Sequence, residues 1–371
     1  MNVAQAKRSS PSPPTSTARQ AGVDVARAIA LIGVVVMNYH GYLILRGGTE
    51  GESFINRTFN PFTGPLSTRF AATFVLVAGM GVTLMTNRSR LSGDRSAITA
   101  HRWVLVRRGL LLYAFGYAFD WIWNGTILFY YGAMFVIAAG LFTLRIRWLV
   151  AAGAAAAIAA AALRWWRFER EQDGHRVDWL FGGASRSPRS LLFETFVNGT
   201  HPLLPWLAFL CAGIVVGRLL PLALHWRMLI VFNGILITVA SHLLKDVVGT
   251  TPLRAELMST VSFQRSINYT IGTLASSLAA VCLIISIADA TRGSRITGAL
   301  AIAGRTTLTL YVLHALVFNA VVELGWIKPA GLDTALAFAL AFWIVAIVAA
   351  DAWARRFGMG PLERAYRHFG G

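Results

Sequence analysis

Residues 23–45 read VDVARAIALIGVVVMNYHGYLIL, and this stretch decides the fold class. It is long and apolar enough to cross a lipid bilayer as a helix, which takes about 20 mostly apolar residues. The rest of the chain agrees, because 56% of its 371 residues are hydrophobic and only 14% are charged. A soluble domain carries about 25% charged residues. The sequence therefore predicts an all-α, polytopic membrane protein built as a helix bundle.

Similar apolar blocks recur along the chain, so we expect about ten transmembrane helices of roughly 20 residues each. They are expected at 23–45, 66–87, 103–122, 126–144, 147–164, 202–220, 227–246, 270–289, 297–323 and 333–354. Lys and Arg concentrate in alternate connections, beginning with the N-terminal segment. By the positive-inside rule, this pattern predicts that both termini are cytoplasmic.

The chain divides into three regions. Residues 1–20 are polar and rich in Ser and Pro, which is typical of a disordered cytoplasmic tail. Residues 21–357 are expected to form the transmembrane domain, in which 165–200 is a long, Arg-rich extracytoplasmic loop. Residues 358–371 are expected to form a cytoplasmic C-terminal tail. We therefore expect a multi-pass protein of the cell membrane (plasma or inner membrane), surrounded by membrane lipid.

The net charge of +17 does not indicate nucleic-acid binding. Basic residues that flank membrane helices explain it, so no nucleic-acid partner is expected. Cys211 and Cys282 lie in different apolar segments, and neither has a CxxC neighbour. This spacing argues against a disulfide framework or a zinc site, and no metal is expected.

Polar groups inside a membrane span are costly, which makes them candidates for function. In the first span, Asp24 and Arg27 are three residues apart and can pair on one helix face. Asn38 follows Arg27 by eleven residues, or about three turns, so the three share a stripe. His40 is rotated off this stripe near the outer end. The pattern favours a polar track across the membrane; the alternative is that Asp24 and Arg27 only anchor the helix.

Several stretches resemble the family of heparan-α-glucosaminide N-acetyltransferases and YeiB-like membrane proteins, and their pattern is most similar to the YeiB-like branch. The first core helix of that family begins with D-x-x-R-G and ends in an Asn near the outer surface. VDVARAIALIGVVVMNY is similar to it, with Ala28 in place of the Gly. Five more similar stretches follow in the expected order: FAATFVLVAGMGVTLM, NGTILFYYGAMFVIAAGL, PWLAFLCAGIVVGR, AGRTTLTLYVLHAL and GMGPLERAYRHF.

The resemblance implies acyl transfer across the bilayer. Acyl-CoA, in the family acetyl-CoA, would donate its acyl group from the cytoplasm. An extracytoplasmic hydroxyl or amine on a sugar or glycolipid would accept it. Because CoA is strongly anionic, its binding favours a basic cytoplasmic mouth. The candidates for this co-substrate site are Asp24, Arg27, Arg107, Arg108 and Arg305.

The acceptor needs a general base with a pKa near neutrality, and His is the usual choice. In the acetyltransferase branch, the catalytic His follows the first core helix, and His40 lies close to that place. His201 and His314 are competing candidates, although each also fits a structural role at an interface or between helices. Asn38 is the candidate donor to an oxyanion of the thioester.

Two other classes of function stay open at this point. A polar track in an apolar bundle also suits a transporter or flippase of a small or lipid-linked solute, and a scaffold without catalysis is a third reading. Acyl transfer predicts saturable binding of acyl-CoA and release of CoA, whereas transport predicts solute accumulation in sealed vesicles. The acceptor, the acyl chain length and the formation of a homo-oligomer are open too.

Overall fold

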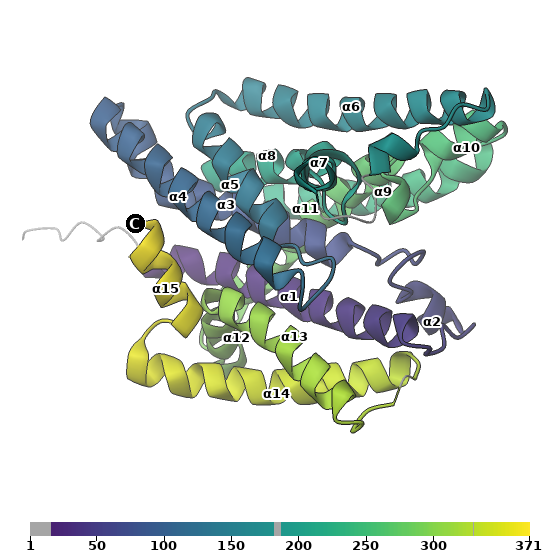
Figure 1. The fold of residues 1–371 in the computed structure, drawn as a ribbon. Helices are drawn as coiled ribbons and strands as arrows, with labels where there is room; N and C mark the ends of the chain where they lie inside the picture. The colour runs from purple at the N-terminus through teal and green to yellow at the C-terminus, as the bar shows by residue number, and fades with distance from the viewer. Residues whose placement is uncertain (1–15, 182–186, 329) are drawn as a thin grey trace, which may run out of the picture.

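The computed structural model describes residues 16–181, 187–328 and 330–371, and within these ranges it contains helices and no strand (Figure 1). The predicted disordered tail falls mostly in residues 1–15, outside the described ranges. The α-helices are α1 (Ser16–Leu45), α2 (Phe54–Thr58), α3 (Arg69–Ser92), α4 (Arg95–Phe119), α5 (Leu128–Leu141), α6 (Ile146–Gln172), α7 (Pro188–Phe193), α8 (Leu203–Leu219), α9 (Leu224–Val248), α10 (Pro252–Met258), α11 (Ile267–Ala290), α12 (Arg295–Arg305), α13 (Thr307–Glu323), α14 (Leu332–Phe357) and α15 (Pro361–Gly370).

The prediction of an all-α, multi-pass membrane protein is confirmed. Six of the described helices are long and apolar enough to cross a membrane, namely α1, α3, α6, α9, α11 and α14. Two bent pairs raise the number to eight if each pair is one span: the 188–198 segment with α8, and α12 with α13. The remaining two predicted spans correspond to α4, in which arginines interrupt the apolar residues, and to α5, which has 14 residues. The count of ten and the cytoplasmic termini stay predictions.

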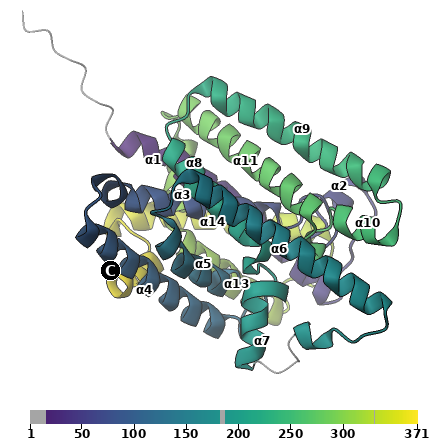
Figure 2. The ribbon, with the colours of Figure 1, turned by 90° about the horizontal axis from the view of Figure 1, so that it is seen from above.

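Helix α1 lies in the middle of the bundle and packs against α3, α11, α12, α13 and α14 (Figures 1 and 2). In its apolar stretch 61% of the residues are buried, against only 11% for α9 at the edge. Helices α6 and α9 therefore turn apolar side chains outward, which is favourable only where lipid covers them. The central position of α1 explains why its polar residues contact other helices and not lipid.

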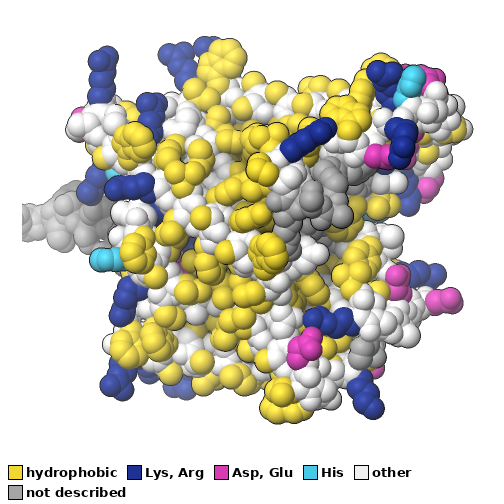
Figure 3. Space-filling view, viewed as in Figure 1, with side chains coloured by type: hydrophobic (Ala, Val, Ile, Leu, Met, Phe, Trp, Pro, Cys, Tyr) yellow, Lys and Arg dark blue, Asp and Glu magenta, His cyan; other side chains and the backbone are white. Residues whose placement is uncertain are grey.

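The two ends of the bundle differ in charge. In Figure 3, Lys and Arg side chains line the left edge, Asp and Glu side chains mix with Lys and Arg toward the right edge, and hydrophobic side chains cover the surface between them. The left edge carries the start of α1, the start of α4 and α15 (Figure 1). We call this end of the bundle the basic end. The opposite end carries α2 and α10, and we call it the far end.

Three regions differ in detail from the expected helices and loops. The predicted span 297–323 is divided at Thr306 into α12 and α13, which are bent by 83°. The start of the predicted 165–200 loop is helical, because α6 continues to Gln172. Later in this loop, α7 runs directly into a π-helix (Glu194–Asn198). The C-terminal segment 361–370 forms α15, which packs against α4 and α13.

Candidate functional site

A cavity of about 310 Å³ opens at the far end, beside the second half of α1. We call it the Asn38 cavity. Its walls come from α1, the start of α3, the loop after α4, the segment before α8 and Tyr311 of α13. The residues that line it are Val34, Met37, Asn38, Gly41, Tyr42, Leu45, Pro61, Phe62, Thr68, Phe70, Ala71, Trp123, Asn124, Gly125, Ile127, Thr200, His201, Phe263 and Tyr311.

Asn38 faces this cavity and is held by a histidine from the opposite end of the chain. The Asn38 Nδ2 atom lies 3.1 Å from Nε2 of His314. The other ring nitrogen of His314, Nδ1, is bonded to the carbonyl oxygen of Tyr311, and a carbonyl can only accept. Nε2 of His314 therefore accepts a hydrogen from the Asn38 amide. This fixes the orientation of the amide and leaves its second N–H for a ligand.

The ring of His314 is fully buried behind Asn38 and does not line the cavity. Tyr39 stacks on it, with ring centroids 6.0 Å apart, and the Tyr39 hydroxyl donates to the His314 carbonyl at 3.1 Å. Trp123 meets the ring edge-on at 5.2 Å. His314 is thus enclosed by aromatic side chains and can act on a ligand only by positioning Asn38.

His201 lines the cavity directly. Its ring lies edge-on to Trp206, with the centroids 4.6 Å apart, and its buried Nδ1 atom has no hydrogen-bond partner among the described residues. The backbone before it is fixed from two sides. The hydroxyl of Tyr130 accepts from Thr200 N at 2.8 Å, and Arg265 donates to the carbonyl oxygens of Val197, at 2.9 Å, and of Gly199.

His40 takes a different position from the one expected of a catalytic base. It is completely buried, its Nδ1 donates to the Phe59 carbonyl at 2.9 Å, and it lines neither of the two cavities described here. The bond holds the loop that follows α2 against α1. Because of this contact, the geometry favours a structural role for His40.

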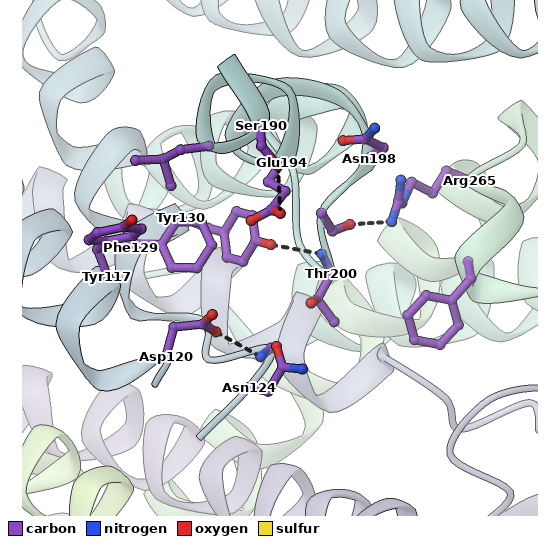
Figure 4. Close-up of a pocket in the computed structure, with 14 residues that line it drawn as sticks. Tyr117, Asp120, Asn124, Phe129, Tyr130, Ser190, Glu194, Asn198, Thr200 and Arg265 are labelled. Atoms are coloured by element: carbon purple, nitrogen blue, oxygen red, sulfur yellow. Dashed lines mark hydrogen bonds between the residues drawn. The ribbon is translucent and has the colours of Figure 1, made fainter. Parts of the chain in front are cut away.

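A second cavity, of about 420 Å³, adjoins the first (Figure 4). We call it the Glu194 cavity. Asn124, Gly125, Thr200 and Phe263 line both cavities, so the two are neighbours. The lining is polar and aromatic, and it consists of Tyr117, Asp120, Asn124, Gly125, Phe129, Tyr130, Ser190, Leu191, Glu194, Asn198, Gly199, Thr200, Phe263 and Arg265.

The charged groups of the Glu194 cavity come from three separate segments. Asp120 follows α4 and accepts from Gly125 N at 2.8 Å. Glu194 accepts from the Ser190 hydroxyl at 3.3 Å. Burial lowers the pKa of the Arg265 guanidinium to about 10, and the positive charges of nearby arginines on α6 act in the same direction. Arg265 therefore stays protonated at neutral pH, and the cavity presents two carboxylates and one cation.

At the basic end, Arg27 ties α1 to the bend between α12 and α13. Its Nη1 donates to the Asp24 carboxylate at 2.9 Å and to the Gly304 carbonyl at 3.1 Å. A Cβ atom on Gly304 would lie only 1.9 Å from the Asp24 carbonyl oxygen, so this position must be glycine for the helices to approach. The predicted pair is formed, and it also joins two segments of the chain.

The other arginines proposed for the basic end surround α15. Arg108 donates to the Gly371 carbonyl at 2.5 Å, and its guanidinium lies 5.7 Å from the ring centre of Tyr366. Glu363 caps the start of α13: its carboxylate accepts from Leu308 N at 2.7 Å and from Thr309 N at 3.1 Å. Arg305, which precedes that cap, is exposed. Arg107 is close to Gly371, and the C-terminal segment thus packs against this end of the bundle.

Six of the nine predicted site residues fall into two groups, while Arg107 and Arg108 contact the C-terminal segment and His40 binds the Phe59 carbonyl. Asn38, His201 and His314 meet around one cavity, whereas Asp24, Arg27 and Arg305 lie near each other at the opposite end of α1. Sequence reasoning passed over Tyr311, Glu194 and Arg265 as site residues. The only sequence signal for these three residues is that each is polar and lies in or near an apolar segment. Many other residues of the chain share this feature, so it does not identify a site.

Comparison with protein families agrees with this architecture. Residues 19–245, well over half of the chain, match the catalytic domain of heparan-alpha-glucosaminide N-acetyltransferase. Residues 218–370 match a second family, described as a protein of unknown function (DUF418). Asn38 and His201 fall in the first match and His314 in the second, so their cavity is assembled from both. Comparison with curated proteins finds no match. The chain belongs to the heparan-alpha-glucosaminide N-acetyltransferase/YeiB-like family of membrane proteins.

Proposed function

We propose that the protein is an acyltransferase that takes an acyl group from acyl-CoA on the cytoplasmic side and gives it to a hydroxyl or amine on the extracytoplasmic side. The observation that carries this proposal is the Asn38 amide, which is oriented by His314 and faces a cavity that it shares with His201. An oriented N–H donor and an imidazole on one cavity are the two groups that acyl transfer requires.

The donor side of the proposal rests on α1. CoA carries several negative charges, and the basic end offers Arg107, Arg108 and Arg305 to bind them. From Arg27 to Asn38 is about 16 Å at 1.5 Å per residue. This is comparable to the length of the extended pantetheine arm of CoA. With its phosphates at the basic end, CoA would thus bring the thioester to the level of Asn38.

In the proposed reaction, His201 removes the proton from the acceptor O–H or N–H as the new O–C or N–C bond forms. The second N–H of Asn38 donates to the thioester oxygen as that oxygen becomes an oxyanion. The C–S bond then breaks and CoA leaves as a thiolate, which takes the proton from His201. Oriented by its bond to His314, Asn38 would need little reorganisation during these steps.

The acceptor side of the proposal rests on the Glu194 cavity. Carboxylates accept hydrogen bonds, amides and hydroxyls both accept and donate them, and the rings of Tyr117, Phe129 and Tyr130 add flat apolar surface. This mixture suits a sugar or the sugar headgroup of a glycolipid. Because Gly125 and Thr200 line both cavities, an acceptor bound there can direct its nucleophile toward His201.

The test uses the purified full chain in lipid vesicles with radiolabelled acetyl-CoA and a panel of amino sugars and neutral sugars. We expect saturable binding of the label and release of CoA, detected with a thiol reagent, when one of the sugars is present. The variant Asn38→Ala should still bind the label, but it should release CoA far more slowly than the wild type.

Absence of saturable acyl-CoA binding would overturn the proposal. Accumulation of a labelled sugar inside sealed vesicles without release of CoA would overturn it in favour of transport.

A further inference from the structure

The walls of the Asn38 cavity are more apolar than an acetyl group requires. Besides Asn38, its lining includes Val34 and Met37 of α1, Phe70 and Ala71 of α3, and the rings of Phe62 and Phe263. A cavity lined in this way stabilises a ligand in proportion to the apolar surface that the ligand brings into it. An acetyl group brings a single methyl.

The size of the cavity leads to the same conclusion. A water molecule takes up about 30 Å³ in the liquid, and a methylene is of similar size, so 310 Å³ has room for about ten such groups. The acetyl group and the attacking atom of an acceptor fill less than half of it. The acceptor itself has the neighbouring Glu194 cavity, so the remaining space in the Asn38 cavity is not needed for the sugar.

We propose that the Asn38 cavity is an acyl-chain subsite and that the protein prefers a short- to medium-chain acyl-CoA, such as butyryl- or hexanoyl-CoA, over acetyl-CoA. This proposal rests on the proposed function and adds the chain length of its donor. The thioester lies at Asn38, and the acyl chain runs along Gly41 of α1 toward Phe62 and Phe263.

Gly41 is the position that sets the length of this subsite. It lines the cavity, and a Cβ atom there would lie 3.4 Å from Pro61 and 3.9 Å from Phe62, which is ordinary contact. A side chain therefore fits at position 41 without displacing backbone, and it takes up the space that the acyl chain would use. Ala71 offers a second such position on the opposite helix, α3.

The experiment is competition for bound radiolabelled acetyl-CoA on the purified full chain by unlabelled acetyl-, butyryl-, hexanoyl- and octanoyl-CoA. Burial of one methylene is worth about a fourfold gain in affinity, so butyryl-CoA should compete about sixteenfold more strongly than acetyl-CoA. The gain should level off or reverse at octanoyl-CoA, where the cavity is full. Gly41→Val should remove most of the gain, and Ala71→Leu is a second variant on the other wall.

The matched control is Gly140→Val on α5, because a side chain there meets nothing within 4 Å. It should keep the preference of the wild type. Equal competition by all thioesters, or a preference for acetyl-CoA, would overturn the chain-length proposal and leave the acyltransferase proposal standing. Retention of the full gain in both Gly41→Val and Ala71→Leu would place the acyl chain elsewhere. Failure of every thioester to bind would overturn both proposals.

Discussion

The two ends of α1 use the same kinds of polar side chain in opposite ways. At the basic end, Arg27 donates to both the Asp24 carboxylate and the Gly304 carbonyl, and Glu363 binds the start of α13. At the far end, Asn38 and His201 face a cavity, and only one side of the Asn38 amide is engaged by His314.

The polar residues at the basic end hold helices together, whereas those at the far end form a candidate binding site. Polar groups that bind one another across helices stabilise the bundle because the membrane offers them no other partners. Polar groups that line a cavity with unused hydrogen-bonding capacity can bind a ligand. We therefore expect substitutions of the cavity residues at the far end to change chemistry with little effect on stability, and substitutions of Gly304 and Glu363 at the basic end to change stability.

The largest effect is expected from His201→Ala. Loss of a general base typically slows a reaction by about 10²- to 10⁴-fold, and here the acceptor would lose the group that removes its proton. The measurement is CoA release from acyl-CoA with the thiol reagent, together with a thermal unfolding scan. His242→Ala on α9 is the control, because within the described residues the His242 ring bonds to its own helix, at the Thr238 carbonyl. A greater loss in His40→Ala, at unchanged stability, would return the role of the base to His40.

The second effect concerns the oxyanion donor. Removal of one such donor costs about 10²- to 10³-fold in kcat, so Asn38→Ala should slow turnover by that factor while the binding of acyl-CoA changes little. Measurement of kcat and KM for the variant separates the two. Asn233→Ala is matched to it, since Asn233 is exposed on α9 and its amide donates to Leu229 of the same helix. A change in KM alone would contradict the assigned role.

The third effect is on stability and compares two glycines of α12. Gly304→Ala forces a methyl against the Asp24 carbonyl, and overpacking of this kind costs about 1–3 kcal/mol. Gly298→Ala meets nothing within 4 Å and should stabilise by about 0.5–1 kcal/mol, because alanine favours the helix. The midpoint of thermal unfolding in detergent reports both variants. If the two alanine variants melt alike, the close approach of α1 and α12 is wrong.

The smallest effect is expected where α15 meets α13. Glu363→Ala removes the acceptor for two backbone N–H groups, and loss of a helix cap costs about 0.5–2 kcal/mol. The unfolding midpoint should fall, and limited proteolysis should cut the C-terminal segment faster than in the wild type. Glu323→Ala serves as the reference, because that side chain is 76% exposed and its ion pair with Arg46 is long, at 3.9 Å. An unchanged cleavage rate in Glu363→Ala would show that this cap does not hold α15.

Composition and periodicity were sufficient to predict the class of the fold. In a chain with so few charged residues, an apolar block long enough to span a membrane is expected to form a membrane helix. Each of the predicted spans is helical in the structure. The sequence also singled out Asp24, Arg27 and Asn38, because a charged or polar group in an apolar helix needs a partner. That they share one side of α1 follows from helical geometry alone.

The identity of the partners was decided only by the tertiary structure. His40 and His314 look alike in the sequence, as single histidines in apolar stretches, yet one binds the Phe59 carbonyl and the other orients Asn38. These contacts join residues as many as 276 positions apart, and helical periodicity carries no information at that range. The close approach of α12 to α1 has the same origin, since Gly304 lies against the Asp24 carbonyl, where a Cβ atom would not fit. Local hydrophobicity thus determined which segments form the long apolar helices, and packing between helices determined which of their polar groups meet.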